Sequence, residues 1–229
     1  FAFGQQTNGA YSLVAQGAGT PLPLSNDAAA RYSGLWADAL PLVAYWGYAG
    51  NSALAVTNAA TGQTSAIDSG RSSPVLPLLW LPGTAQLVFR DSDGQIRLAD
   101  FSCLQSTCSG SPEQFNIRTL ASGDADVTSD DNWLFFRTGS SISAVDLACV
   151  ATDSCLSSAV LVAANAAPQT PLSAAGGILV YTGFAQNAND PNDREVRGVN
   201  LACLNSGGCA GQTIATGARA GALAASGRF

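Results

Sequence analysis

The residues with the most distinctive spacing in this sequence are six cysteines, which occur as three close pairs. An even number of cysteines in local pairs is typical of disulfides formed in an oxidising compartment. A redox-active motif has two residues between its cysteines, whereas these pairs enclose four or five. A zinc site needs four converging ligands, and the chain has no histidine. We therefore expect no metal here and one disulfide within each pair: Cys103–Cys108, Cys149–Cys155 and Cys203–Cys209.

A second candidate for chemistry is the acidic segment formed by Asp91, Ser92, Asp93 and Gly94. Alternating carboxylates followed by glycine are found in calcium-binding loops, where their oxygens surround the ion. The full twelve-position pattern is absent, and no glutamate closes the segment. A plain hairpin turn is therefore the favoured interpretation. Calcium at Asp91 and Asp93 is the alternative, and we expect no other cofactor.

Four more carboxylates, Asp124, Asp126, Asp130 and Asp131, lie near one predicted strand. Glycoside hydrolysis needs two carboxylates about 5–10 Å apart on either side of the scissile bond. These four are bunched in one segment instead of being distributed along the chain. The sequence also lacks a histidine to activate a serine, and it has no glycine-rich phosphate loop. A glycosidase, on the five-bladed fold that is inferred from the repeats below, is therefore our third hypothesis. We assign no catalytic residue.

Aromatic side chains offer a different function, because flat rings stack on the faces of sugars. Aromatic residues in strands are, however, more often part of the core. A carbohydrate-binding, lectin-like function is therefore the first alternative. The residues concerned are Trp36, Tyr45, Trp46 and Tyr48, with Trp80 and Trp133 elsewhere in the chain.

A polar, acidic insertion with the sequence "NANDPNDRE" is longer than a hairpin loop needs. A solvated excursion is the simpler interpretation of this segment. Long loops nevertheless carry function more often than chance, so a loop that binds a protein partner is the functional interpretation. Its candidate contact residues are Asn187, Asn189, Asp190, Asn192, Asp193, Arg194 and Glu195.

Composition limits the classes of partner. The 229 residues include 11% charged and 47% hydrophobic residues, and the net charge is -6. An acidic chain with scattered arginines and no lysine lacks the clustered basic face that nucleic-acid binding requires. No apolar run approaches the roughly 18 residues of a membrane-spanning helix, and the start "FAFGQQ" lacks a signal-peptide pattern. We expect neither a nucleic-acid partner nor a membrane span. We also expect the chain to be a processed product or an excised fragment.

The residues above lie within a sequence repeat, and the fold of that repeat determines where they are placed. An apolar triplet begins at Phe1, Leu42, Leu87, Leu134 and Leu179, at intervals of 41, 45, 47 and 45 residues. A period of this length in a sequence rich in strand-forming residues predicts an all-β fold of the propeller type.

Each repeat unit is predicted to contain four short strands. In the repeat that contains Leu134 we expect them at 125–128, 133–137, 141–147 and 159–163, and we find no segment with a convincing helical period. The apolar triplets lack polar alternation, which is expected where a sheet is covered on both faces.

An Asp or Asn recurs three residues before the first cysteine of each pair, at Asp100, Asp146 and Asn200. A short acceptor side chain at such a place caps the backbone N–H groups of the following turn. We favour this structural role over the alternative, a ring of ligands.

The two ends of the chain fit together in the repeat. The final residues "SGRF" stop where the first triplet resumes, and the interval from Leu179 through Phe229 to Phe1 is 51 residues. We expect one domain of five four-stranded blades, with repeats at 25–70, 71–120, 121–165 and 166–217. The fifth blade combines about 1–24 with 218–229, so that its innermost strand comes from about 219–225. The alternative is a slice of a larger propeller.

The succession of strand, turn and strand, with an Asp or Asn before each cysteine pair, resembles the TolB-like (PD40/WD40-like) propellers. The matching positions are Ser129 to Asn132 and Ser226-Gly227 for the first motif of that family, and Asn58 to Gly62 with Asp100, Asp146 and Asn200 for the second. The cysteines are not part of the family pattern. The resemblance implies a fold and a habit of binding protein partners, and it transfers no catalytic residue.

The leading hypothesis is therefore a non-catalytic β-propeller that acts as a protein-binding or scaffolding module. The disulfides predict an extracytoplasmic location: secreted, periplasmic or on the cell surface.

The shared blade is testable by hydrogen exchange. If the two ends of the chain pair in one sheet, deletion of residues 219–229 will remove the amide protection of residues 1–13. Unchanged protection of these N-terminal amides would contradict closure and favour an open slice.

Overall fold

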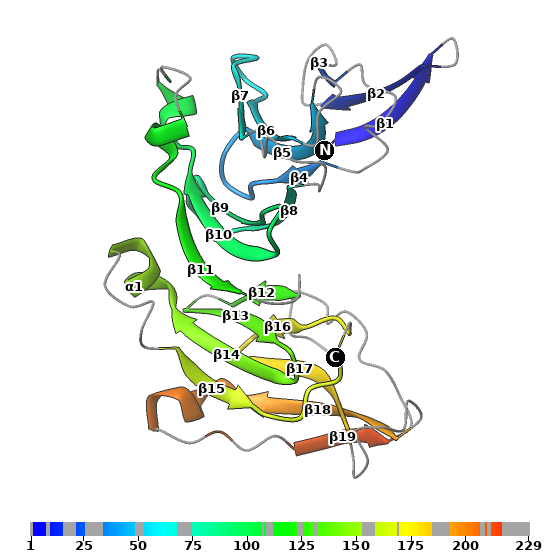
Figure 1. The fold of residues 1–229 in the computed structure, drawn as a ribbon, viewed down its shortest axis with the longest axis vertical. Helices are drawn as coiled ribbons and strands as arrows, with labels where there is room; N and C mark the ends of the chain where they lie inside the picture. Colours follow the sequence, from blue (N-terminus) through cyan, green and yellow to red (C-terminus); the bar gives the residue numbers. More distant parts are fainter. Residues whose placement is uncertain are drawn as a thin grey trace. The chain divides into compact units, whose positions relative to one another are not determined.

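A computed structural model of the chain describes most of the predicted strands (Figure 1). The residues that it describes are 2–7, 10–15, 22–25, 34–48, 53–67, 75–106, 108, 112–122, 126–130, 132–152, 159–168, 170–184, 193–206, 209 and 212–216. The chain divides into two compact units, residues 1–121 and 122–229, and each is considered by itself.

The first unit consists of antiparallel sheets in which sequential strands pair (Figure 1). A three-stranded sheet contains β1 (Ala2–Thr7), β2 (Ala10–Ala15) and β3 (Leu22–Ser25). A four-stranded sheet follows with β4 (Leu35–Trp36), β5 (Leu42–Tyr48), β6 (Ala53–Asn58) and β7 (Thr64–Ile67). The next contains β8 (Leu76–Trp80), β9 (Gln86–Arg90), β10 (Gln95–Asp100) and β11 (Arg118–Ser122).

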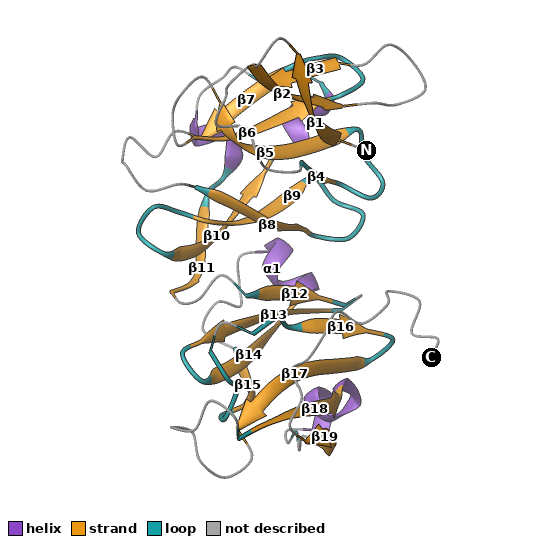
Figure 2. Cartoon of the chain, turned by 90° about the vertical axis from the view of Figure 1, so that its right-hand side faces the viewer, coloured by secondary structure: helices purple, strands orange, loops and turns teal. Residues whose placement is uncertain are grey.

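The second unit repeats this arrangement twice. One sheet contains β12 (Val127–Ser129), β13 (Trp133–Thr138), β14 (Ser141–Asp146) and β15 (Val160–Ala163). The other contains β16 (Ser173–Ala175), β17 (Ile178–Phe184), β18 (Arg194–Asn200) and β19 (Gln212–Thr216). Figure 2 shows that strands dominate the described parts of the chain.

These sheets confirm the all-β fold class and the four-stranded meander of a propeller blade. The strands of the repeat that contains Leu134 lie within two residues of their predicted bounds. Strands β1 to β3 are the three strands expected from the N-terminal segment. The proposed fourth strand, at 219–225, lies outside the described residues, so closure remains a prediction.

The second strand of each four-stranded sheet has a run of residues that are buried on both faces. Leu87, Val88 and Phe89 on β9 are consecutive and at most 1% exposed. Consecutive side chains of a strand point to opposite faces, so burial of a whole run requires cover on both sides. Within the units, part of that cover is the next sheet along the chain: β4 contacts β8, and β12 contacts β16.

The recurring Asp and Asn residues cap turns, as predicted. In each case the side-chain Oδ1 accepts a hydrogen bond from the backbone N–H two residues further on, at 2.8–3.0 Å. The residues are Asn58, Asp100, Asp146 and Asn200. Asn58 does more, because its Nδ2 also donates to the backbone oxygen of Leu104 at 2.8 Å and so links the end of β6 to the short helix that follows β10.

Disulfides join Cys103 to Cys108 and Cys203 to Cys209, as the sequence predicted. Cys149 is also disulfide-bonded, while Cys155 lies outside the described residues. Each of the two bridges closes a loop that begins with a short 3₁₀ helix, Ser102–Gln105 and Leu201–Ser206.

Short helices follow the third strand of three sheets, although the sequence showed no helical period. The α-helix α1 (Leu147–Thr152) is only six residues long, so a periodic pattern cannot develop. A further 3₁₀ helix spans Pro112–Phe115, before β11.

A fully buried arginine anchors the connection between β15 and β16. The Nη1 of Arg137, on β13, donates to the backbone oxygens of Ala167 and Thr170 at 2.6 and 2.9 Å, and to Thr170 Oγ1 at 3.2 Å. Its Nη2 pairs with the carboxylate of Asp126, just before β12. A buried charge is tolerated only when it is paired and hydrogen-bonded, and these contacts fulfil that condition.

Replacing Arg137 by methionine should therefore lower the free energy of unfolding by about 3–5 kcal/mol, because the substitution removes hydrogen bonds to two backbone oxygens and leaves the Asp126 carboxylate without its ion-pair partner. Asp126→Asn should cost less, since the Asp126 side chain is 29% exposed and the arginine keeps its backbone partners. Urea unfolding measures both losses. Equal losses, or none for Arg137→Met, would contradict this role.

Candidate functional site: the β17–β18 hairpin

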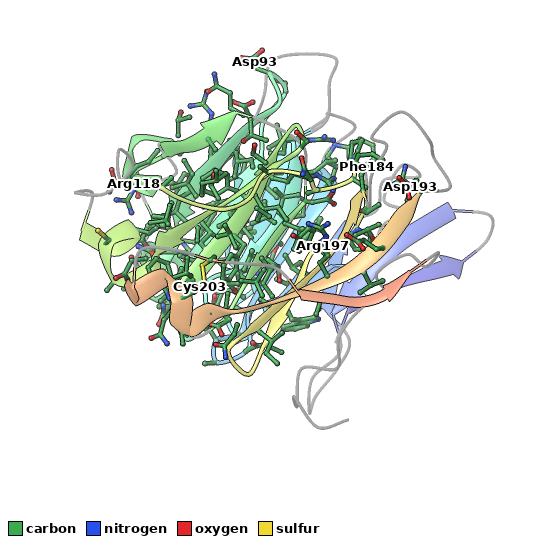
Figure 3. All side chains as sticks on the ribbon, turned by 90° about the horizontal axis from the view of Figure 1, so that it is seen from below. Asp93, Arg118, Phe184, Asp193, Arg197 and Cys203 are labelled. Carbon is green, nitrogen blue, oxygen red and sulfur yellow. A yellow bond between two sulfur atoms is a disulfide. The ribbon has the colours of Figure 1, made fainter. Side chains whose placement is uncertain are left out.

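The candidate partner-binding loop lies in the connection between β17 and β18. Asn187, Asn189, Asp190 and Asn192 lie outside the described residues. The structure describes the ends of the connection, where Phe184 pairs in register with Arg194. Figure 3 labels Phe184 and Asp193 at this loop end of the hairpin and Cys203 toward the other end.

An arginine lies over an aromatic ring where the two strands separate. The guanidinium carbon of Arg194 is 5.2 Å from the centroid of the Phe184 ring, a cation–π distance. Because these residues are directly opposite each other, the contact joins the last residue of β17 to the first residue of β18. It holds the two ends of the connection together.

Four residues share the opposite face of the same hairpin. The register pairs Tyr181 with Arg197 and Gly183 with Glu195. Alternate residues of a strand point to the same side, so all four lie on one face. The guanidinium of Arg197 pairs with the Glu195 carboxylate on its own strand. Its Nη2 also donates weakly to the backbone oxygen of Phe184, at 3.5 Å.

Gly183 makes room for this arrangement. A Cβ at this position would lie 3.2 Å from Arg197 Cδ and 3.3 Å from Arg197 Nε, so any larger residue would crowd the arginine. The same Cβ would lie 3.2 Å from the backbone oxygen of Asn165. That oxygen also accepts the N–H of Phe184 at 3.0 Å, which ties the segment before β16 to the end of β17.

The electrostatics of this face favour one fixed charge state. Burial disfavours the phenolate and raises the pKa of Tyr181 above its usual value, although Arg197 partly offsets this effect. Burial opposes the charge on Arg197, but hydrogen bonds with Glu195 and Tyr181 outweigh it and raise the pKa of the guanidinium. Tyr181 therefore stays neutral and Arg197 stays charged at neutral pH.

Glu195 is not the open carboxylate that the sequence predicted for the loop. It lies on β18, is 5% exposed and pairs with Arg197. The sequence "NDRE" suggested continuous solvent exposure, whereas the strand begins at Arg194 and its register turns Glu195 inward. Of the predicted acidic residues, Asp193 remains at the end of the connection, and Asp190 lies outside the described residues.

The candidate calcium residues form a hairpin turn between β9 and β10. Asp91 Oδ1 accepts the N–H groups of Asp93 and Gln95, both at 2.9 Å, and Oδ2 pairs with Arg97. Burial raises the pKa of Asp91, but these hydrogen bonds outweigh it and lower the pKa. Gly94 has a φ of 79°, as the turn requires. Both Asp91 oxygens thus have partners within the hairpin, which supports the hairpin interpretation.

The carboxylates considered for hydrolysis have structural partners where they are described. Asp126 pairs with Arg137. Asp130 accepts the N–H of Asn132 at 3.1 Å and that of Gly177 at 3.3 Å, which joins the turns of two consecutive sheets. Asp124 and Asp131 lie outside the described residues.

Aromatic residues considered for sugar binding are mostly used in packing. Tyr45 is fully buried, and its hydroxyl lies 3.2 Å from Thr57 Oγ1. Trp80 donates from Nε1 to the backbone oxygen of Leu35 at 2.8 Å. Trp36 and Trp133 pack at the edges of hydrophobic clusters. Trp46 is half-buried, and the side chain of Tyr48 is outside the described set.

In the described part of the chain, no three His, Cys, Asp or Glu side chains come together as metal ligands. Among the described residues, no helix has the length and apolar character needed to cross a membrane.

Comparison with known proteins finds no matching family model and no curated relative. Solved structures give partial matches. A chain in the S. cerevisiae complex of Dbp5 with Nup159, Gle1, IP6 and ADP is 10% identical with a TM-score of 0.46, over 79% of this chain and 46% of that chain. The N-terminal domain of Nup159 is 11% identical with a TM-score of 0.43, over 79% of this chain and 46% of that chain. A structure from a study of two prolyl endopeptidases is 16% identical with a TM-score of 0.35, over 87% of this chain and 41% of that chain.

This chain spans less than half the length of each of those chains. With TM-scores below 0.5, these matches carry no inference about activity or partners. The TolB-like resemblance remains a prediction from the sequence.

The role of Gly183 is testable by adding one methyl group. Gly183→Ala should lower the free energy of unfolding by about 1–3 kcal/mol, because the new Cβ would crowd both Arg197 and the Asn165 oxygen. In the double variant with Arg197→Ala only the backbone contact remains, so the two effects should not add. Thermal or urea unfolding measures this, and a Gly183→Ala protein as stable as wild type would contradict the close packing.

Proposed function

We propose that the chain is a non-catalytic protein-binding or scaffolding module whose partner contacts the connection between β17 and β18. The single observation that carries this proposal is the length of that connection relative to its equivalents. Nine residues, 185–193, separate β17 from β18, whereas two separate β13 from β14 and four separate β9 from β10.

The rest of the described structure supports a binding role rather than catalysis. Most side chains on the second strand of each four-stranded sheet are buried, so the connections are the parts of the chain that can vary more freely. The described carboxylates Asp91, Asp126, Asp130 and Glu195 are engaged in turns or ion pairs. A carboxylate held in this way is a structural element.

The charge of the connection indicates the chemistry of the partner. The segment carries Asp190 and Asp193, and the whole chain has a net charge of -6. A partner that is basic or rich in hydrogen-bond donors is complementary to such a surface, and attraction of this kind weakens with added salt. The disulfides support an extracytoplasmic setting for the encounter.

Shortening the connection tests this function. In one variant, residues 187–193 are replaced by Asn-Gly, which favours a tight hairpin. The probe is an array of 12-residue peptides whose net charges run from negative to positive. Wild type should bind positively charged peptides with an affinity that falls with salt. The shortened protein should lose at least about tenfold in affinity, or ~1.4 kcal/mol, at an unchanged melting temperature.

As a matched control, Asp93→Asn removes one carboxylate from the β9–β10 turn and should leave peptide binding unchanged. Full binding by the shortened variant, or no peptide binding by wild type, would refute the proposed function.

A further inference from the structure

The Cys103–Cys108 bridge lies beside the main hydrophobic cluster of the first unit. Both cysteines pack against this cluster, which contains residues of β5, β6, β9 and β10. Leu104, which directly follows Cys103, is fully buried in the cluster. The short helix Ser102–Gln105 therefore brings the bridge and a core side chain together.

A hydrogen bond from β6 depends on the position of this helix. Asn58, the last residue of β6, is 3% exposed, and its Nδ2 donates to the backbone oxygen of Leu104 at 2.8 Å. Its Oδ1 caps the following turn by accepting the N–H groups of Ala60 and Thr61 at 2.9 and 3.3 Å. If the Leu104 oxygen moved away, a buried donor would lose its partner, which is costly. Asn58 thus couples the helix to the β6–β7 turn.

The backbone of the helix restrains it only weakly. The N–H of Leu104 donates to the oxygen of Phe101, and that of Ser106 donates to the oxygen of Cys103, both at 3.0 Å. A 3₁₀ helix of four residues has poor hydrogen-bond geometry and little stability of its own. The covalent bond at Cys103 therefore supplies a restraint that this backbone lacks.

The equivalent bridge of the second unit offers an internal comparison. Cys203–Cys209 also packs against a hydrophobic cluster, and Leu204 is buried in it. The residue at the end of the third strand in the preceding sheet is Asp146, whose Oδ1 accepts the N–H of Ala148. A carboxylate accepts hydrogen bonds but has no N–H to donate. The link that Asn58 makes is therefore specific to the first unit.

We propose that the Cys103–Cys108 bridge is a redox-sensitive latch: its reduction by a dithiol frees the Ser102–Gln105 helix and, through Asn58, loosens the β6–β7 turn. Both cysteines are partly exposed, and exposed bridges are the more readily reduced ones. This inference does not depend on the proposed partner-binding function.

The chemistry of the latch is ordinary thiol–disulfide exchange. A thiolate of the dithiol attacks one sulfur of the bridge, the S–S bond breaks, and a mixed disulfide forms. The second thiol of the reductant then displaces the remaining cysteine. The bridge gains two electrons and two protons and becomes two cysteine thiols, while the dithiol is oxidised to a disulfide.

Reduction of the intact chain is the first test. The protein is incubated in buffers with increasing ratios of reduced to oxidised dithiothreitol. Alkylation with peptide mass mapping reports which bridges have opened, and circular dichroism reports whether the strands remain. The Cys103–Cys108 bridge should open while the strands remain folded. If it opens only when the whole chain unfolds, the latch is overturned.

Paired substitutions separate this bridge from the others. Cys103→Ser with Cys108→Ser should make hydrogen exchange at least about tenfold faster at amides 104–106 and at amides 60–61. The matched control, Cys203→Ser with Cys209→Ser, should leave both segments at their wild-type rates. Equal acceleration in the control would show a general loss of stability and would overturn the latch.

Asn58→Ser tests the route from the helix to the turn. A serine hydroxyl still caps the turn, although more weakly, and it is too short to reach Leu104. In this background, removal of the Cys103–Cys108 bridge should still accelerate exchange at 104–106 but should no longer change exchange at 60–61. An unchanged rate at 60–61 when the bridge is removed from the protein with Asn58, or the same acceleration with and without Asn58, would refute the coupling.

Discussion

Burial of the second strand of each four-stranded sheet on both faces is the constraint on which the rest of this structure depends. A sheet whose second strand carries consecutive buried side chains, such as Leu87 to Phe89, cannot be stable alone. Such a sheet must be covered on two sides, and repetition of one four-stranded element supplies part of that cover within each unit. The strands are therefore committed to packing, and the connections are left to carry function.

Polar side chains make the stacking of sheets specific. Asn58 reaches the backbone of Leu104, in the short helix after β10, and Asp130 reaches the turn before β17 at Gly177. Arg137 holds the segment that leads from β15 to β16. Hydrogen bonds require defined directions, so they fix how neighbouring sheets meet in a way that apolar contacts alone do not. The same segment, at Asn165, supports Phe184, so packing within the second unit extends to the candidate site.

The sequence predicted what depends on local pattern. Apolar triplets gave the strands, cysteine spacing gave the bridges Cys103–Cys108 and Cys203–Cys209, and short acceptors gave the turn caps. It did not predict contacts across long separations, because the partners of Arg137 lie 30 and 33 residues away. Glu195 was misplaced for a related reason: its burial depends on strand register and on Gly183 opposite, whereas its neighbours in sequence are polar.

The central claim is that partners bind at the loop end of the β17–β18 hairpin. A hydrogen-exchange footprint tests this claim most directly. The intact chain is compared with and without a saturating basic peptide. The account predicts new protection confined to amides of residues 185–194, with no change in the β9–β10 turn at 91–94 or the β13–β14 turn at 139–140. Protection at either of those turns, or along β4 and β5 around Trp36 and Tyr45, with none at 185–194, would contradict it.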